Sequence, residues 1–217
     1  MAGIFITFEG IDGSGKSTQM RMLASALRLR GLDVVSTREP GGTPFGKRLR
    51  AALLDMHEHV DPLAELLLFA ADRAHHVRTL LRPALESGHI VLSDRYADAT
   101  RAYQGAGRGF SKELIGEVIE LATGGLKPDL TLIFDLSVAE CGVRARRRTH
   151  DGHKGDRLDS EDAAFHTRVR NAYLEIARLE PQRVRIIDAS GSIDETHART
   201  MDVVMQFIKS RVNSQES

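Results

Sequence analysis

Nine consecutive residues near the amino terminus decide the fold, and they read Gly10-Ile11-Asp12-Gly13-Ser14-Gly15-Lys16-Ser17-Thr18. The run matches the pattern G-x-x-x-x-G-K-[ST] without a gap. Glycines let successive backbone N–H groups turn toward phosphate oxygens, and the amino end of a following helix adds positive potential. We therefore expect this loop to bind nucleotide phosphates, with Lys16 on the terminal phosphates and Ser17 as a ligand of Mg²⁺.

The residues on both sides of this loop provide the strand and the helix that the pattern requires. Before the loop, apolar residues alternate with others, which predicts a strand over Gly3 to Phe8. After it, helical spacing predicts a helix that stops at Gly31, with an apolar face made of Met20, Leu23, Ala24 and Leu27. The loop does not match G-x-G-x-x-G, so a dinucleotide site is disfavoured. The chain also lacks the Asn-Lys pair with which a switch GTPase reads guanine.

Strands and helices alternate over the rest of the chain. Short apolar runs predict strands at Val34 to Thr37, Ile90 to Leu92, Leu130 to Leu136 and Val184 to Ile187. Helical spacing predicts helices at about Asp61 to Glu86, after a Ser111 cap, at Phe165 to Leu179 and at Met201 to Val212. The apolar positions of the long helix are Leu63, Leu67, Ala70, Ala74, Val77 and Leu81. Irregular structure is expected at residues 40–44 and 105–109, where glycine and proline gather.

This alternation predicts the fold class. Strands separated by helices need crossover connections, which give a parallel sheet covered on both faces, so we expect a three-layer α/β fold. Ligands of such sheets bind beyond the carboxyl ends of the strands. Three more groups of polar residues follow predicted strands and are candidates for the site: Arg38 to Thr43, Asp94 to Tyr96, and the basic run Arg144 to Arg148.

The composition is that of one globular domain without a field that would attract nucleic acid or a membrane. The 217 residues are 41% apolar and 28% charged, and 30 basic residues balance 30 acidic ones. A single cysteine, Cys141, is typical of a reducing compartment, and neither a leader nor a membrane span is apparent. We expect a cytoplasmic protein that binds neither nucleic acid nor membranes. Cys141 is expected to be buried and inert, and the histidines, among them His57, His59, His75, His76, His150 and His153, to lie on the surface.

Taken together, these elements resemble thymidylate kinases of the bacterial type. The matching segments follow the family order over about residues 3–190: Phe8-Glu9-Gly10 into Gly15-Lys16-Ser17-Thr18, Thr37-Arg38-Glu39-Pro40-Gly41-Gly42-Thr43, Phe69-Ala70-Ala71-Asp72-Arg73, Ser93-Asp94-Arg95-Tyr96, Ala102-Tyr103-Gln104-Gly105-Ala106-Gly107-Arg108-Gly109 and Lys127-Pro128-Asp129-Leu130. The phosphate loop is shared by many families, whereas the Arg-Glu-Pro-Gly-Gly-Thr and Ala-Tyr-Gln-Gly segments are far more specific.

The resemblance implies a P-loop nucleoside monophosphate kinase fold that transfers a phosphoryl group from ATP to dTMP with Mg²⁺, giving dTDP and ADP for dTTP synthesis. It implies a homodimer. Residues 1–213 would form one kinase domain with a lid at about 144–160, followed by a polar tail at 214–217. Other readings remain open: another nucleoside monophosphate or deoxynucleoside kinase, or, outside enzymes, an ATP-dependent switch.

The resemblance also implies roles for residues. Phe69 would stack on thymine, although its spacing is equally compatible with core packing, and Arg73, Thr100 and Gln104 would lie around the polar edge of the base. Arg38 and Arg95 would hold the acceptor phosphate. The remaining assignments place Asp12, Glu39 and Tyr103 near the deoxyribose, Asp94 near Mg²⁺, Arg144 on adenine, and Lys16, Arg95, Arg148 and Arg157 in catalysis. The Glu39–Pro40 bond is a candidate for the cis form.

Two features depart from the family pattern. The lid is longer, with His150 to Gly155 inserted, and Ala99 stands where many relatives have serine. The proposed nucleophile is a phosphate oxygen of dTMP, whose second pKa of about 6 leaves it mostly dianionic at neutral pH, so no general base is needed.

Overall fold

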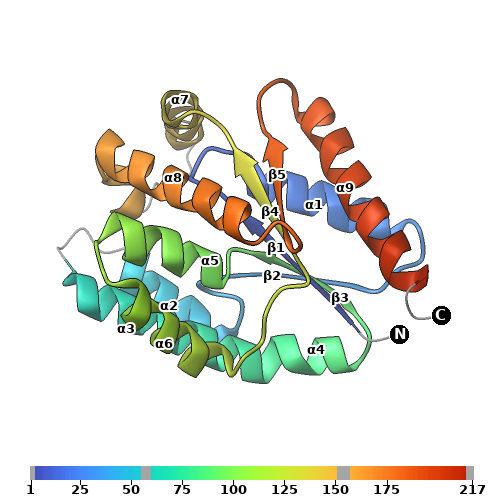
Figure 1. Ribbon diagram of the computed structural model, residues 1–217, viewed down its shortest axis with the longest axis horizontal. Coiled ribbons are helices and arrows are strands. Elements are labelled where there is room, and N and C mark those ends of the chain that lie inside the picture. The colour runs from blue at the N-terminus through green and yellow to red at the C-terminus, as the bar shows by residue number, and fades with distance from the viewer. Residues whose placement is uncertain (1–2, 55–59, 151–156, 214–217) are drawn as a thin grey trace.

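The parallel sheet predicted from the sequence is present. The computed structural model describes residues 3–54, 60–150 and 157–213. In this part of the chain the strands form one parallel sheet in the order β2-β3-β1-β4-β5 (Figure 1). Their bounds are Ile4–Glu9 for β1, Val34–Arg38 for β2, Ile90–Asp94 for β3, Leu130–Asp135 for β4 and Val184–Asp188 for β5.

Helices cover both faces of this sheet (Figure 1). They are α1 (Lys16–Arg28), α2 (Pro44–Leu54), α3 (Pro62–His76), α4 (Arg82–Glu86), α5 (Ala97–Thr100), α6 (Lys112–Thr123), α7 (Val138–His150), α8 (Ala163–Leu179) and α9 (Ile193–Asn213). Two π-helical segments, η1 (Val77–Leu81) and η2 (Arg101–Gly107), continue α3 and α5, and a 3₁₀ turn, η3, spans Arg157–Ser160. No helix in the described ranges combines the length and the apolar composition that a membrane crossing requires.

Successive side chains of β1 point to opposite faces of the sheet, and this explains why helices pack on both faces. Ile4, Ile6 and Phe8 point to one face and pack with α1 and α9, whereas Phe5 points to the other and packs with α3, η1 and α6. The predicted apolar face of α1 is buried as expected. Ser111 caps α6 by accepting a hydrogen bond from the Leu114 N–H at 3.2 Å, also as expected.

Two predictions of local structure were wrong. The long helix does not bury Leu63 and Leu67, which are 48% and 54% exposed; Glu65, Leu66, Asp72, Arg73 and His76 face inward instead. Polar residues occupy that face because they find hydrogen-bond partners on other segments. The predicted helical stretch over Asp61 to Glu86 is itself present, as α3, the π segment η1 and α4. Finally, helical structure continues through Gly107 in η2 and is not interrupted at Gly105.

Several predicted features fall outside the described residues. These are the lid insertion, of which residues 151–156 lie outside, the polar tail at 214–217, His57, His59 and His153. Arg148 belongs to α7, but its side chain and that of His150 are outside the described part.

Candidate active site

The phosphate loop joins β1 to α1 in the way the motif requires. Gly10, Gly13 and Gly15 have φ values of 137°, 91° and 92°, which favour glycine over residues with a side chain. Gly13 also has no room for a side chain, because a Cβ there would lie 2.2 Å from the carbonyl oxygen of Cys141 in α7. Tight packing against α7 therefore fixes the path of the loop.

A cavity of about 370 Å³ opens beside this loop. Its wall is made by residues 13–19 together with Arg144 of α7 and Gly191 to Ile193 and Thr196 at the start of α9. Arg144 is half-buried and donates a hydrogen bond to the Ala189 carbonyl at 3.2 Å. The structure thus brings Arg144 to the phosphate loop, although the two are far apart in the sequence.

One carboxylate joins two cations at the carboxyl ends of β1 and β3. Asp12 Oδ1 is 2.8 Å from Lys16 Nζ, and Asp12 Oδ2 is 2.6 Å from Arg95 Nη2. Arg95 is the one non-glycine residue in the described ranges with a positive φ, 74°, and its N–H is held by the Phe8 carbonyl at 3.0 Å. Its guanidinium also donates to the Tyr103 hydroxyl at 3.0 Å. This backbone conformation directs Arg95 toward the phosphate loop.

Ser17 and Asp94 form a second polar pair next to the loop. The Ser17 hydroxyl donates to Asp94 Oδ2, and Asp94 is 7% exposed. Its other oxygen, Oδ1, is buried and has no hydrogen-bond partner within the described part of the chain. An unpartnered buried carboxylate oxygen beside a hydroxyl is a set of donors that suits a hard divalent cation such as Mg²⁺.

A buried network surrounds Arg73 on α3. Its Nε donates to Glu39 Oε2, its Nη1 to the Thr100 hydroxyl, both at 2.8 Å, and its Nη2 to the Tyr96 carbonyl at 2.9 Å. The other Glu39 oxygen lies 2.8 Å from His76 Nδ1. The Glu39–Pro40 bond is cis, as the sequence predicted.

His76 was expected on the surface, and that expectation was wrong. The ring is fully buried, and its Nε2 lies 2.7 Å from the Thr37 hydroxyl. The interaction with Glu39 explains the burial, because both ring nitrogens find polar partners there. Cys141, in contrast, is buried as predicted, and burial raises the pKa of its thiol to about 11.

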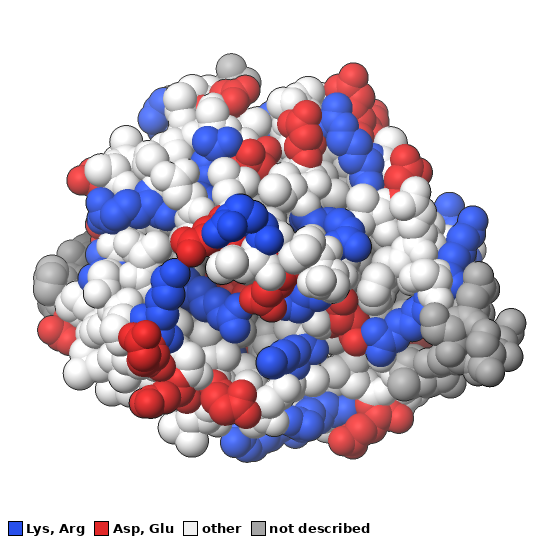
Figure 2. Space-filling model, in the orientation of Figure 1, with Lys and Arg blue, Asp and Glu red and all other residues white. Residues whose placement is uncertain are grey.

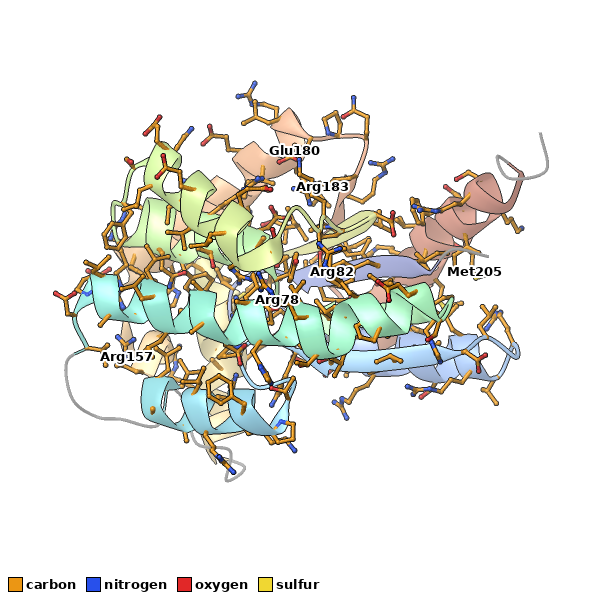
Figure 3. All side chains as sticks on the ribbon, turned by 90° about the horizontal axis from the view of Figure 1, so that it is seen from below. Arg78, Arg82, Arg157, Glu180, Arg183 and Met205 are labelled. Carbon is orange, nitrogen blue, oxygen red and sulfur yellow. The ribbon has the colours of Figure 1, made fainter. Side chains whose placement is uncertain are left out.

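Glu65 gathers polar groups at the other end of α3. It is fully buried, and its carboxylate accepts from Gln104 Nε2 at 2.8 Å, from Arg108 Nη2 at 3.0 Å and from Arg157 Nη2 at 2.5 Å. Arg157 lies beside the amino-terminal end of α3 (Figure 3) and also donates to the Leu53 carbonyl at 3.4 Å. Phe69, one helical turn after Glu65, is half-buried against the core.

The structure brings together most, though not all, of the residues singled out in the sequence. Lys16, Asp12, Arg95 and Tyr103 are linked by hydrogen bonds, as are Glu39, Arg73 and Thr100. Arg38 is exposed at the end of β2 and makes no hydrogen bond or ion pair with other described residues. Arg157 contacts Glu65 rather than the phosphate loop.

Sequence reasoning missed three buried polar residues: Glu9, Glu65 and His76. Glu9 accepts from the Tyr96 N–H at 2.7 Å and from the Tyr173 hydroxyl at 2.8 Å. Burial and the charge of Asp98 raise the pKa of Glu9 to about 8 against the lowering effect of Arg95. The signal was available for Glu9, because it is the one carboxylate of an otherwise uncharged strand, where an unpaired charge is costly.

The phosphate loop lies at the end of the central strand, and cations converge on it. The protein is therefore of the class of P-loop phosphotransferases with the nucleoside monophosphate kinase fold. The family model described as thymidylate kinase matches residues 8–200. The chain belongs to the thymidylate kinase family, whose enzymes phosphorylate dTMP to dTDP.

Individual relatives agree over nearly the whole chain. The thymidylate kinase of Pelobacter propionicus is 46% identical over 215 residues, which cover 98% of this chain and 97% of the relative. That of Deinococcus radiodurans is 48% identical over 204 residues, covering 94% and 97%. The crystal structure of thymidylate kinase from Ehrlichia chaffeensis matches with a TM-score of 0.76 at 35% identity, and the match covers 94% of this chain and 99% of that one.

Proposed function

We propose that this chain transfers the terminal phosphoryl group of ATP to dTMP at the junction of Lys16, Asp12 and Arg95. The observation that carries the proposal is that one carboxylate, Asp12, holds both cations, at 2.8 and 2.6 Å. Lys16 belongs to the loop that would bind the donor phosphates, and Arg95 directly follows β3 on the acceptor side. Donor and acceptor phosphates bound to these two cations would meet, which is the alignment that phosphoryl transfer needs.

The ATP site would be the cavity beside the phosphate loop. Residues 10–18 would hold the phosphates, and Arg144, in the cavity wall, would stack on adenine. Ser17 and Asp94 would hold Mg²⁺, since Asp94 Oδ1 is buried without a partner in the described ranges. When bound, the ion would neutralise charge on the transferring phosphate.

The acceptor site would lie along α3 and the α5–η2 segment. Phe69 would stack on the base, with Arg73, Thr100 and Gln104 at its polar edge, while Arg38 and Arg95 would hold the phosphate. Arg38 suits this role because its side chain is exposed and makes no hydrogen bond or ion pair with other described residues. Asp12, Glu39 and Tyr103 would border the deoxyribose. Glu39 would act there through Arg73 and His76, which already occupy both of its oxygens.

Catalysis would rest on alignment and charge rather than on a general base. The acceptor phosphate is already mostly dianionic at neutral pH. Lys16 and Arg95 would offset the repulsion between the two anions, and Arg148 or Arg157 would add charge from the lid. Because Arg157 is paired with Glu65, it would have to exchange that partner to reach the phosphates.

The assembly is expected to be a homodimer in the cytoplasm, with residues 1–213 as one kinase domain. Helices α2 and α6 pack on α3, and together they expose Phe45, Leu63, Leu67 and Leu121, which are 45%, 48%, 54% and 79% exposed. An apolar surface of this kind favours contact with a second copy. Figure 2 shows basic and acidic side chains interspersed on the face seen, a distribution that does not favour nucleic acid or membranes.

The proposed function is tested by incubating the chain with ATP, Mg²⁺ and dTMP and separating the nucleotides by chromatography. We expect dTDP and ADP in equal amounts. A nucleoside kinase would instead phosphorylate thymidine, and an ATP-dependent switch would release phosphate with no acceptor present. Either result, without dTDP, would overturn the proposal.

A further inference from the structure

Two hydrogen-bonded pairs join α3 to the α5–η2 segment on either side of Phe69. Glu65 pairs with Gln104 and Arg73 pairs with Thr100, each at 2.8 Å. On α3, residues 65, 69 and 73 share one helical face, and on the facing segment residues 100 and 104 do the same. Phe69 therefore lies on α3 one turn from each pair, and a flat ring stacked on it would have the Gln104 amide and the Arg73 guanidinium within reach of its edge.

Glu65 is held in its ionised form. The side chain is fully buried, which by itself raises its pKa, but hydrogen bonds from Arg108, Arg157 and Gln104 outweigh burial and lower the pKa below its ordinary value. An ionised carboxylate only accepts hydrogen bonds. The group that Gln104 turns toward Glu65 must therefore be its NH₂.

The orientation of the Gln104 amide follows from this contact. With Nε2 bound to Glu65, the carbonyl oxygen Oε1 points the other way, and no other described residue donates to it. A flipped amide would bring Oε1 against a carboxylate oxygen and give up the hydrogen bond from Nε2, a cost that disfavours it by about tenfold or more. Gln104 thus presents Oε1, an acceptor, on the side away from Glu65.

We propose that Glu65 is a specificity-determining positioning residue: it fixes the Gln104 amide so that Oε1 accepts the N3–H of thymine and refuses cytosine. Cytosine has an acceptor at N3, so two acceptors would face each other in its complex. The inference rests on the proposed function, because it concerns the base of the same acceptor nucleotide. It adds a residue that would not touch the substrate.

The test is the ratio of kcat/KM for dTMP over dCMP in Glu65→Gln. A neutral amide at position 65 can donate as well as accept, so Gln104 is free to turn its NH₂ toward the base. We expect the ratio to fall at least about tenfold, with part of the change a gain on dCMP. The matched control, Arg108→Gln, removes another partner of Glu65 and should change both rates by the same factor. A folded, dTMP-active Glu65→Gln with the wild-type ratio would overturn the inference.

Gln104→Met separates an effect on the amide from a general effect on the site. This change should lower the ratio as well, and the double variant should lower it no further, because both changes act through one hydrogen bond. If the double variant instead lowers the logarithm of the ratio by the sum of the two single effects, the inference is contradicted.

A measurement on the unchanged chain covers the case in which Glu65→Gln does not fold. In NMR spectra of the dTMP-bound protein, the side-chain NH₂ signal that disappears in Gln104→Met should exchange slowly with solvent. Rapid exchange would contradict the contact with Glu65. Failure of the proposed function has a different signature, since the wild-type chain would then form no dTDP at all.

Discussion

Lys16, the first residue of α1, is proposed to act in the chemistry without carrying the fold. The residue is 4% exposed, and its ammonium is held by Asp12, which keeps Arg95 as a second partner when the lysine is removed. We expect Lys16→Ala to lower kcat by about 10³-fold or more, since a charge aimed at the transferring phosphate is lost. Coupled ADP release measures the effect. The exposed Lys47→Ala serves as the control, and a Lys16→Ala variant with normal stability and near wild-type turnover would contradict the role.

Glu9 makes stability depend on pH. Its pKa is about 8 in the folded chain against an ordinary value of 4.5. Between these values the folded state keeps the proton and the unfolded state releases it. The contribution of Glu9 is therefore complete below pH 4.5, shrinks as pH rises, and is lost above about pH 8.

Glu9→Gln removes this dependence, because the amide does not titrate. We expect the free energy of unfolding of the wild-type chain to fall relative to the variant from pH 5 to pH 8, by up to about 1.4 kcal/mol per pH unit. Urea denaturation at several pH values gives both curves. Parallel curves over this range would mean that Glu9 is ionised in the folded chain.

At this scale, the sequence could predict the residues expected to contact a ligand, but not those that are buried by pairing with each other. The residues of the phosphate loop, Arg95 and Arg144 stand in or next to recognisable motifs. His76 does not, because the partners that draw it inward, Glu39 and Thr37, come from β2 and the turn after it. A histidine paired through the fold cannot be told from a solvated one by local spacing alone.

At the scale of elements, the phosphate loop depends on its contact with α7. A side chain at Gly13 would meet the Cys141 carbonyl at 2.2 Å and would also have to adopt a φ of 91°. We expect Gly13→Ala to weaken ATP binding at least about tenfold, because the loop must move away from α7. Calorimetric titration with a non-hydrolysable ATP analogue measures the change.

Gly116→Ala is the matched control for this variant, since its Cβ would meet open space within α6. Alanine there should leave affinity unchanged and add up to about 1 kcal/mol of stability. If Gly13→Ala binds the analogue as tightly as Gly116→Ala does, the packing of the loop on α7 does not determine the affinity for ATP.

The element that sequence reasoning described least well is α3. Its apolar spacing suggested a buried stripe through Leu63 and Leu67, but both are about half exposed. The inward face carries Glu65, Asp72 and Arg73 because each finds partners on other segments. The spacing of apolar residues cannot predict a buried polar network. It predicted α1 correctly because the inward face of that helix is mostly apolar, with Lys16 and Gln19 as its polar members.

At the scale of the whole molecule, the order of strands and helices was enough to predict the sheet, because crossover connections leave few alternatives. We propose that the exposed apolar residues on α2, α3 and α6 form an interface between two copies. We expect Leu67→Glu to give monomers, since a charge would have to be buried at the contact. Light scattering after gel filtration measures the mass, with Leu29→Glu on the other side of the sheet as the control. A wild-type chain that is monomeric at micromolar concentration contradicts the homodimer.

The central claim is that the site between Phe69 and Arg73 accepts dTMP. The most direct test compares kcat/KM for dTMP, dUMP, dCMP, AMP and GMP with saturating MgATP. We expect kcat/KM to be highest with dTMP. It should be lower with dUMP, because the loss of one methyl contact weakens transition-state binding by about 1–3 kcal/mol. It should be lower still with dCMP, and the purine nucleotides should be excluded by size. A highest kcat/KM with AMP or GMP would contradict the account.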